Sequence, residues 1–161
     1  MTIRQTTPAD FERIQEIYAY AREQMRRAGN PGQWGEDRPS RETIFTDIRN
    51  GQSYVIEQEG DICGVFAFIL GEDPTYRIIE KGQWLDDAPY GTIHRIAGSG
   101  TAKGIFRECL SHCMSRISNI RIDTHRDNAP MRHLLEKHGF RECGVIYVED
   151  GSPRIAYQKR L

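Results

Sequence analysis

Apolar residues recur every three or four positions in several parts of the chain, which is the spacing of a helix with one buried face. Thr7 and Pro8 suit a helix start, and Ser40 does so for a second helix. We expect helices from Thr7 to Gly29, from Ser40 to Asn50, from Ile105 to Ile117 and from Asn128 to His138.

The segments between these helices alternate or run apolar in a way that is typical of strands. We expect strands over Ile3–Gln5, Tyr54–Glu57, Ile62–Leu70, Tyr90–Ala97, Ile120–Thr124, Gly144–Val148 and Arg154–Lys159. Residues 71–89 are rich in Gly, Pro and Asp and look irregular. The order is β-α-α-β-β-β-α-β-α-β-β, which predicts an α/β (α+β) fold with a mostly antiparallel, twisted sheet flanked by helices.

Composition narrows the class of protein. A chain of 161 residues with 38% apolar residues predicts a single globular domain over residues 1–161. A net charge of −1 gives no support for nucleic-acid binding. No apolar run is long enough to span a membrane, and the first residues lack a signal-peptide core, so we expect a cytoplasmic protein. The four cysteines lack metal-ligand spacing, and we expect no metal site.

A loop of small residues separates the strand that ends at Ala97 from the helix that starts at Ile105. Such a loop exposes main-chain N–H groups beside the positive end of a helix dipole, which suits a phosphate or pyrophosphate. No Gly-Lys-Ser/Thr triplet follows, so the loop is not a Mg-nucleotide P-loop. Taken alone, an ordinary strand-to-helix turn explains it better. The loop residues are Ser99, Gly100, Thr101, Ala102, Lys103 and Gly104.

Two motifs of the C-terminal half match one known family. Ser99, Ala102 and Gly104 stand where that family has a pyrophosphate loop, Gln/Arg-x-x-Gly-x-Gly/Ala, ahead of a helix. Asn128 and Gly139-Phe140 match its later pattern, an asparagine that starts a helix ending in Gly-Phe. With the order of elements, these motifs resemble the GCN5-related N-acetyltransferase (GNAT) superfamily. The stretches similar to a bacterial subgroup are Ile93–Ala97, Ile122–His125 and Gly151–Lys159.

The resemblance implies an acetyl-CoA-dependent N-acetyltransferase that needs no metal. It places the CoA pyrophosphate on the loop from Ser99 to Gly104 and on Ile105, and Asn128 beside the pantetheine arm or the pyrophosphate. It also implies that a main-chain N–H near Ile96 or Ala97 polarises the thioester carbonyl. Asn128 also has an ordinary explanation as a helix N-cap.

The chain departs from the family pattern at two places. Ser99 and Ala102 replace the usual Gln/Arg and Gly, but main-chain donors survive both changes. Many members carry a tyrosine seven residues after the asparagine, where it can protonate the departing thiolate, and this chain has Leu135 there. This second departure favours an alternative function, a non-catalytic acyl-CoA-binding module.

Two histidines are candidates for the base that removes a proton from the acceptor amine. Strand alternation predicts that His94 and Ile96 share a face, beside the acetyl group. His94 is the first candidate, and a structural histidine is an equally good explanation. His125, just after a strand, is the second candidate, and a surface-loop role explains it somewhat better.

The acceptor is the least constrained part of the prediction. Trp34, Tyr76 and Trp84 lie in loop-like segments and suit the binding of a cationic amine, although plugs under long loops are the commoner role of such tryptophans. We expect direct transfer in a ternary complex to the primary amine of a small molecule, with no nucleic acid or membrane as partner and a homodimer as one option. A phosphate-binding protein unrelated to CoA is a third interpretation.

Overall fold

A computed structural model describes residues 1–161 and confirms the predicted order of strands and helices. Two short 3-10 helices, Pro8–Asp10 and Pro74–Tyr76, add to that order. The main elements are β1 (Thr2–Gln5), α1 (Phe11–Arg27), α2 (Arg41–Arg49), β2 (Ser53–Gln58), β3 (Asp61–Leu70), β4 (Gly91–Gly98), α3 (Ile105–Met114), β5 (Asn119–Thr124), α4 (Ala129–Lys137), β6 (Arg141–Tyr147) and β7 (Pro153–Arg160).

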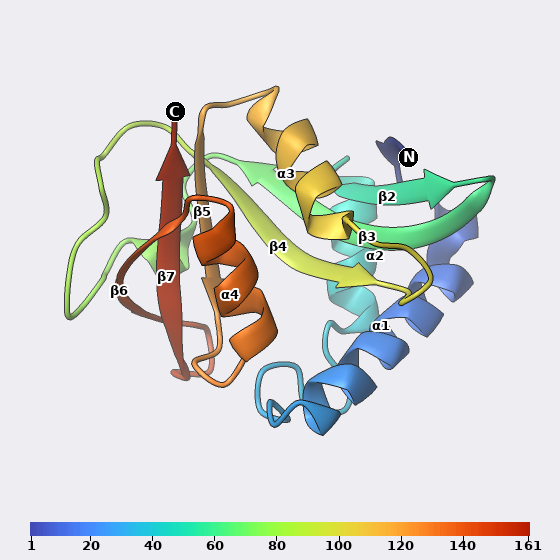
Figure 1. The fold of residues 1–161 in the computed structure, drawn as a ribbon, viewed down its shortest axis with the longest axis horizontal. Coiled ribbons are helices and arrows are strands. Elements are labelled where there is room, and N and C mark those ends of the chain that lie inside the picture. Colours follow the sequence, from blue (N-terminus) through green and yellow to red (C-terminus); the bar gives the residue numbers. More distant parts are fainter.

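The seven strands form one sheet in the order β1-β2-β3-β4-β5-β7-β6. Every neighbouring pair is antiparallel except β4 and β5, which confirms the mostly antiparallel sheet. The parallel pair is short, because only Gly91 and Thr92 of β4 have partners in β5. Beyond them the two strands diverge (Figure 1). From Ile93 to Gly98, β4 therefore has no strand neighbour on the β5 side.

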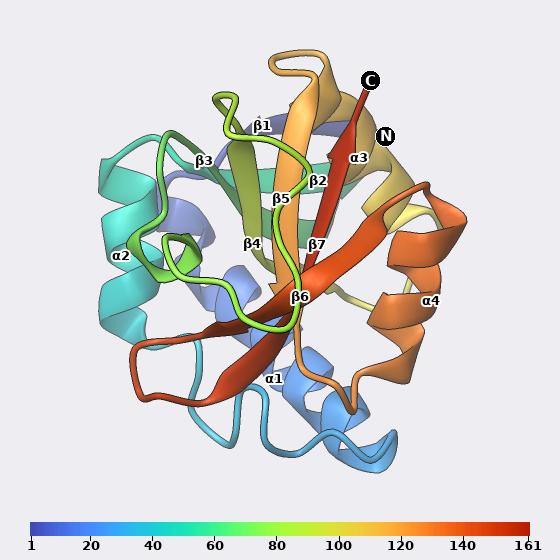
Figure 2. The ribbon, with the colours of Figure 1, turned by 90° about the vertical axis from the view of Figure 1, so that its left-hand side faces the viewer.

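Helices cover both faces of this sheet, with α2 and α4 on opposite sides in Figure 2. On one face, α3 and α4 pack on a main core cluster, and on the other α1 and α2 pack on a second cluster. Burial of the predicted apolar faces supplies the driving force for both layers. The fully buried members include Ile56, Phe66, Ile120, Leu135 and Tyr157 in the main cluster and Ile14, Ile17 and Val55 in the second.

A pair of glycines brings the start of α3 close to the sheet. Gly64 of β3 and Gly98 of β4 are cross-strand partners. A Cβ atom at Gly64 would lie 3.1 Å from Ile105, and one at Gly98 would lie 3.4 Å from the same side chain. Side chains at these positions would push the first turn of α3 outward. The glycine pair therefore positions the loop between β4 and α3 at the end of the diverging strands.

The segment 71–89, expected to be irregular, folds back over the sheet and forms a third apolar cluster. Tyr76 and Tyr90 are buried there against Ile146 and Ala156. Glu80 pairs with Val145 of β6 through main-chain hydrogen bonds of 2.9 and 2.8 Å. The segment is therefore fixed to the C-terminal strands rather than free in solvent.

Candidate active site

A β-bulge interrupts β4 in its middle. Ala97 pairs with Val65 and His94 pairs with Ala67, so that Arg95 and Ile96 together face a single residue of β3, Phe66. The extra residue breaks the alternation of faces. Ile93 and Ile96 both pack in the main cluster, whereas His94 contacts Asp73. The prediction that His94 and Ile96 share a face is therefore wrong, because period-two alternation does not anticipate a bulge.

Arg95 is held in the bulge at both its side chain and its main chain. Its backbone has φ of +54°, a left-handed conformation that is costly for a residue with a Cβ atom. The guanidinium binds both oxygens of the buried Asp47 carboxylate at 2.7 and 2.8 Å. The Tyr18 hydroxyl donates to the Arg95 carbonyl at 2.8 Å. Contacts from α1 and α2 thus stabilise the strained residue.

The same contacts orient the peptide that joins Arg95 to Ile96. This peptide is trans, so its C=O and N–H point in opposite directions. Because Tyr18 of α1 holds the carbonyl, the Ile96 N–H points away from α1. Ile96 has no registered partner in β3 or β5. The bulge therefore presents a main-chain donor outside the sheet ladder.

The start of α3 offers several further donors. Gly104 is its N-cap, with φ of +79°, and no side chain caps the helix. The first bond of the helix runs from the Glu108 N–H to the Gly104 carbonyl at 3.0 Å, so the preceding N–H groups, from Ile105 to Arg107, have no helical partner. By contrast, Ser40 caps α2 and Asn128 caps α4. An uncapped start with free N–H groups suits an anion.

The loop before α3 is compact and polar. The hydroxyls of Ser99 and Thr101 lie 2.6 Å apart, and the Ser99 N–H donates to the Cys63 carbonyl at 2.9 Å. Gly100 has φ of +82°, and a Cβ atom there would meet the Tyr20 ring. Lys103 is exposed. The predicted loop residues therefore form a compact turn between β4 and α3.

His94 forms a hydrogen-bonded pair with Asp73. Its Nε2 lies 2.9 Å from Asp73 Oδ2. Burial opposes ionisation of Asp73, but hydrogen bonds from His94 and Thr75 outweigh it and lower the pKa of the carboxyl to about 2. The ionised carboxylate accepts the Nε2 proton, which leaves Nδ1 as the basic nitrogen. Nδ1 has no protein partner and is not enclosed.

His125 is arranged differently. Its Nδ1 accepts the Asp127 N–H at 3.0 Å, so the neutral ring carries its proton on Nε2. Burial lowers the pKa of His125, and the charge of Arg154 lowers it further. His125 therefore presents a hydrogen-bond donor rather than a free lone pair. The geometry favours His94 over His125 as a base.

The aromatic residues predicted to bind an amine lie in two places. Trp84 and Tyr90 hold the Arg121 guanidinium between them, at 4.1 and 4.0 Å from the ring centroids. The cation on these rings is thus one of the protein's own. Tyr76 contacts Trp84 and donates its hydroxyl to Asp123 at 2.6 Å. Trp34 lies apart from them, edge-on to Tyr18 with ring centroids 5.5 Å apart.

Asn128 uses both ends of its side chain within the protein. Its Oδ1 accepts the Met131 N–H at 3.2 Å, which confirms the N-cap interpretation. Its Nδ2 donates to Gln33 Oε1 at 2.9 Å, and the same oxygen accepts from Asn30 and Thr124. Leu135 is fully buried in the main cluster. Unlike the tyrosine that many family members have at this position, it has no hydroxyl.

Several residues of this region escaped sequence analysis. Asp47 lies three positions after Ile44 on an otherwise apolar helix face, and such a misplaced charge is a usable signal. Tyr18 looked like an ordinary core residue of α1. Asp73, Gln33 and Arg154 act through partners distant in sequence, and no local pattern marks them.

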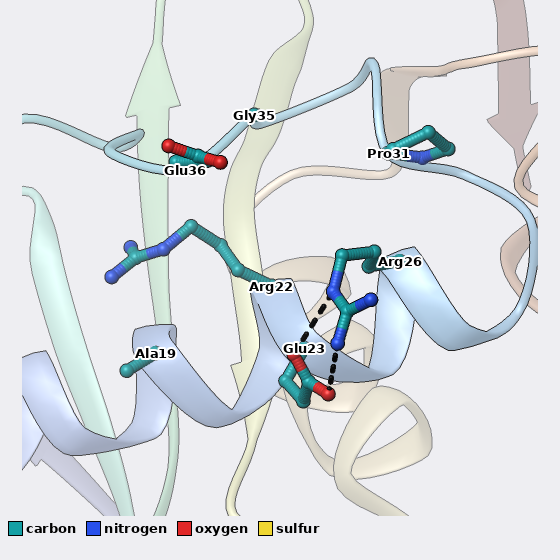
Figure 3. Close-up of a pocket in the computed structure, with 7 residues that line it drawn as sticks. All are labelled: Ala19, Arg22, Glu23, Arg26, Pro31, Gly35 and Glu36. Atoms are coloured by element: carbon teal, nitrogen blue, oxygen red, sulfur yellow. Dashed lines mark hydrogen bonds and ion pairs between the residues drawn. The ribbon is translucent and has the colours of Figure 1, made fainter.

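A hollow of about 480 Å³ lies between α1 and the segment that follows it. Figure 3 shows the residues that line it. Its wall contains the ion pair between Glu23 and Arg26, 2.6 Å apart. None of the predicted site residues lines it. No group of three His, Cys, Asp or Glu side chains is placed to hold a metal ion, and no helix is long and apolar enough to cross a membrane.

Comparison with known proteins decides the family. The family model described as an acetyltransferase (GNAT) domain matches residues 1–141. A GNAT-family acetyltransferase from Streptococcus agalactiae 2603 is 32% identical to this chain and superposes on it with a TM-score of 0.90. The match covers 99% of this chain and 95% of the Streptococcus protein. The chain belongs to the GNAT acetyltransferase family. The seven-stranded sheet with diverging β4 and β5 is thus a GNAT fold.

More distant GNAT structures share the fold alone. A phosphinothricin acetyltransferase from Sinorhizobium meliloti, solved in complex with AcCoA, is 18% identical with a TM-score of 0.65, over 99% of this chain and 88% of its own. A ribosomal-protein-alanine N-acetyltransferase from Brucella melitensis is 19% identical with a TM-score of 0.67, over the full length of both chains. No curated protein matches this GNAT sequence.

Proposed function

We propose that this GNAT protein transfers the acetyl group of acetyl-CoA directly to the primary amine of a small molecule. One observation carries the proposal. Within a single stretch, β4 and its loop bring together a carboxylate-bound histidine, an N–H outside the sheet ladder and an uncapped helix start. These correspond to a base, an oxyanion donor and a phosphate site. The base and the oxyanion donor would accelerate acyl transfer from a thioester, and the phosphate site would bind CoA.

The chain's own residues suit the donor. When bound, acetyl-CoA supplies an acetyl group activated as a thioester. The N–H groups of Gly104 and Ile105 and the loop from Ser99 would hold the pyrophosphate, with Lys103 free to pair with a phosphate oxygen. The edge of β4 at Ile96 and Ala97 lacks a strand on the β5 side and would hold the pantetheine arm by main-chain bonds. Asn128 is the N-cap of α4, at the end of the turn that follows β5.

His94 and Ile96 divide the chemistry. A free alkylamine has a pKa of about 10.4 and must lose a proton before it attacks. His94 Nδ1 accepts that proton, while Asp73 stabilises the imidazolium that results. The Ile96 N–H stabilises the negative charge on the thioester oxygen, and loss of such a donor costs about 10² to 10³ in rate. The neutral amine attacks to form the C–N bond, the C–S bond breaks, and the nitrogen loses its second proton to solvent.

The residue at position 135 affects where the leaving thiolate obtains its proton. Because Leu135 has no proton to donate, the thiolate takes its proton from water in this account. The same feature supports a second candidate function, an acyl-CoA-binding module without turnover. Under the first function, amine addition releases a free thiol from acetyl-CoA. Under the second, acetyl-CoA binds and no thiol appears.

Calorimetric titration with acetyl-CoA, desulfo-CoA and ADP tests the donor site. We expect binding of acetyl-CoA and desulfo-CoA that is at least about tenfold tighter than binding of ADP, because the pantetheine arm adds contacts along β4. Equal affinity for ADP and acetyl-CoA would contradict the proposal and point to a phosphate site unrelated to CoA.

A further inference from the structure

Arg154, near the start of β7, is a buried cation without an anionic partner. The residue is 6% exposed. Its two Nη atoms donate to main-chain carbonyls, those of Pro153 at 2.8 Å and Gln33 at 3.2 Å. No carboxylate lies within 4.0 Å of it, in contrast to Arg95, which binds Asp47 at two points. A guanidinium removed from water without a counter-charge is costly.

The Nε donor of Arg154 is available to a ligand. Its Nε has no partner in the protein, and it is not enclosed. The Nε of Arg121 is also without a partner, but that atom is enclosed and its guanidinium lies between two rings. Burial lowers the pKa of Arg154, and the charges of Asp123 and Asp150 only partly offset this. Arg154 is thus the buried cation that an incoming anion can reach.

The neighbours of Arg154 place it on the sheet face opposite α3. Ile155 and Tyr157, which alternate with it along β7, pack in the main cluster with α3 and α4. Arg154 therefore faces away from α3, whose uncapped start is the proposed phosphate site. It shares its face with Asp123, because Asp123 pairs with Ala156 in the register of β5 and β7.

Two further contacts connect this face to the base. Asp123 accepts the Tyr76 hydroxyl, and the Tyr76 ring lies 6.3 Å from the His94 ring. His125 directly follows Thr124, which pairs with Ile155 in the register of β5 and β7, and its Nε2 lies toward Gly32. The face thus offers Arg154 and His125 as donors and Asp123 as a carboxylate. Such a set complements a molecule that carries both an amine and a carboxylate.

We propose that Arg154 binds the carboxylate of the acceptor and that the acceptor is therefore a free amino acid. His125 is a second donor to the same carboxylate, and Asp123 attracts the ammonium group before His94 removes its proton. The inference rests on the proposed function, since it names the acceptor of that reaction. The N-terminus of a protein is a poorer fit, because its first carbonyl is an uncharged amide.

Comparison of L-amino acids with the corresponding amino-acid amides tests the inference on the wild-type protein. Each pair presents the same side chain and an amine, and only the acid carries the carboxylate. With acetyl-CoA as donor, we expect kcat/KM for the preferred acid to exceed that for its amide by about tenfold to a hundredfold, mainly through KM. Equal kcat/KM values, or a preference for amides, would overturn the inference and leave the proposed function standing.

Arg154→Met extends the test to the residue. It should remove the preference for the acid, so that kcat/KM for the acid falls to about the value for its amide. Arg38→Met is the matched control, since Arg38 is an exposed arginine paired with Asp150 and its loss should leave the preference intact. Arg154→Lys keeps the charge, so it should retain part of the preference if Arg154→Met folds poorly. A full preference in a folded Arg154→Met would contradict the role.

A binding measurement separates failure of the inference from failure of the proposed function. Thermal unfolding of the CoA-bound protein is followed with the same acids and amides, a readout that needs no turnover. Stabilisation by acids alone, lost in Arg154→Met, would support the carboxylate site even if no amine were acetylated. No stabilisation by any acid, together with no discrimination in turnover, would overturn it.

Discussion

The Tyr18 hydroxyl donates a hydrogen bond of 2.8 Å to the main-chain carbonyl of Arg95. This bond joins α1 to the bulge of β4 and fixes the peptide whose other end is the Ile96 N–H. The bidentate pair between Arg95 and Asp47 holds the same residue from α2. Together these contacts position the proposed oxyanion donor, the Ile96 N–H. The side chains that make the contacts do not themselves touch the substrate in this account.

Tyr18→Phe should therefore slow transfer rather than weaken donor binding. The lost hydrogen bond is worth about 1 kcal/mol, which corresponds to about a fivefold fall in kcat with KM for acetyl-CoA unchanged. Tyr54→Phe is the control, because the Tyr54 hydroxyl forms no hydrogen bond and its ring stacks on Phe66. Steady-state kinetics of thiol release measures both. Equal kcat values for the two variants would remove Tyr18 from the positioning of Ile96.

His94→Ala should lower kcat by about a hundredfold or more, because no other group with a free lone pair replaces Nδ1. Asp73→Asn should lower kcat less, and Glu72→Gln, on the exposed neighbour that pairs with Arg77, should have no effect. Acetyl-CoA affinity by calorimetry should stay near wild type in all three. Unchanged turnover of His94→Ala across pH would exclude it as the base.

Gly104→Glu should weaken acetyl-CoA binding by at least about tenfold, because it places a carboxylate beside the proposed pyrophosphate site. Gly29→Glu is the control. Gly29 has a similar φ of +86° and open space around it, so the same backbone strain and charge are introduced away from α3. Calorimetry on both variants separates the local effect from a general one. Normal acetyl-CoA affinity in Gly104→Glu would show that the phosphates bind elsewhere.

His112 should make the protein less stable in acid. Its ring packs against Tyr54 and Phe66, and its Nε2 is enclosed without a partner. Burial lowers the pKa of His112, and the charge of Arg116 adds to this. The unfolded chain then binds the proton more readily than the folded one. Stability is therefore present above the ordinary histidine pKa of about 6.5 and is lost as pH falls below it.

Thermal unfolding between about pH 7 and pH 5 tests this, a range in which histidine titrates. His112→Gln should reduce the loss of stability on acidification, and His133→Gln, at an exposed position, should leave it unchanged. Part of the loss should persist in His112→Gln, because burial also lowers the pKa of His125 and of His138. An acid response identical to wild type would contradict the role of His112.

The elements were predictable because each buries one face, and burial imposes a period of 2 or 3.6 on the sequence. The bulge was not, since one extra residue in β4 shifts every later side chain without changing composition. The ring pair around Arg121 shows a related limit. Trp84 was predicted as a loop aromatic that could bind a cation, but the cation between Trp84 and Tyr90 comes from β5, far along the chain.

The site was predictable where it depends on the chain's local order. The loop from Ser99 to Gly104 is contiguous, and its proposed role as a phosphate site rests on its place before a helix. The pair of His94 and Asp73 joins residues 21 positions apart, and the contact of Arg154 with Gln33 spans 121. Such contacts depend on how the sheet brings strands together, and no pattern in one segment reveals them.

Amine-dependent release of free thiol from acetyl-CoA, with mass spectrometry of the product, is the most direct test of acetyl transfer. The proposed function predicts thiol release only when an amine is added, and one acetyl group on the nitrogen of that amine. Binding of acetyl-CoA without thiol release from any amine would contradict it, and the chain would then be an acyl-CoA-binding module.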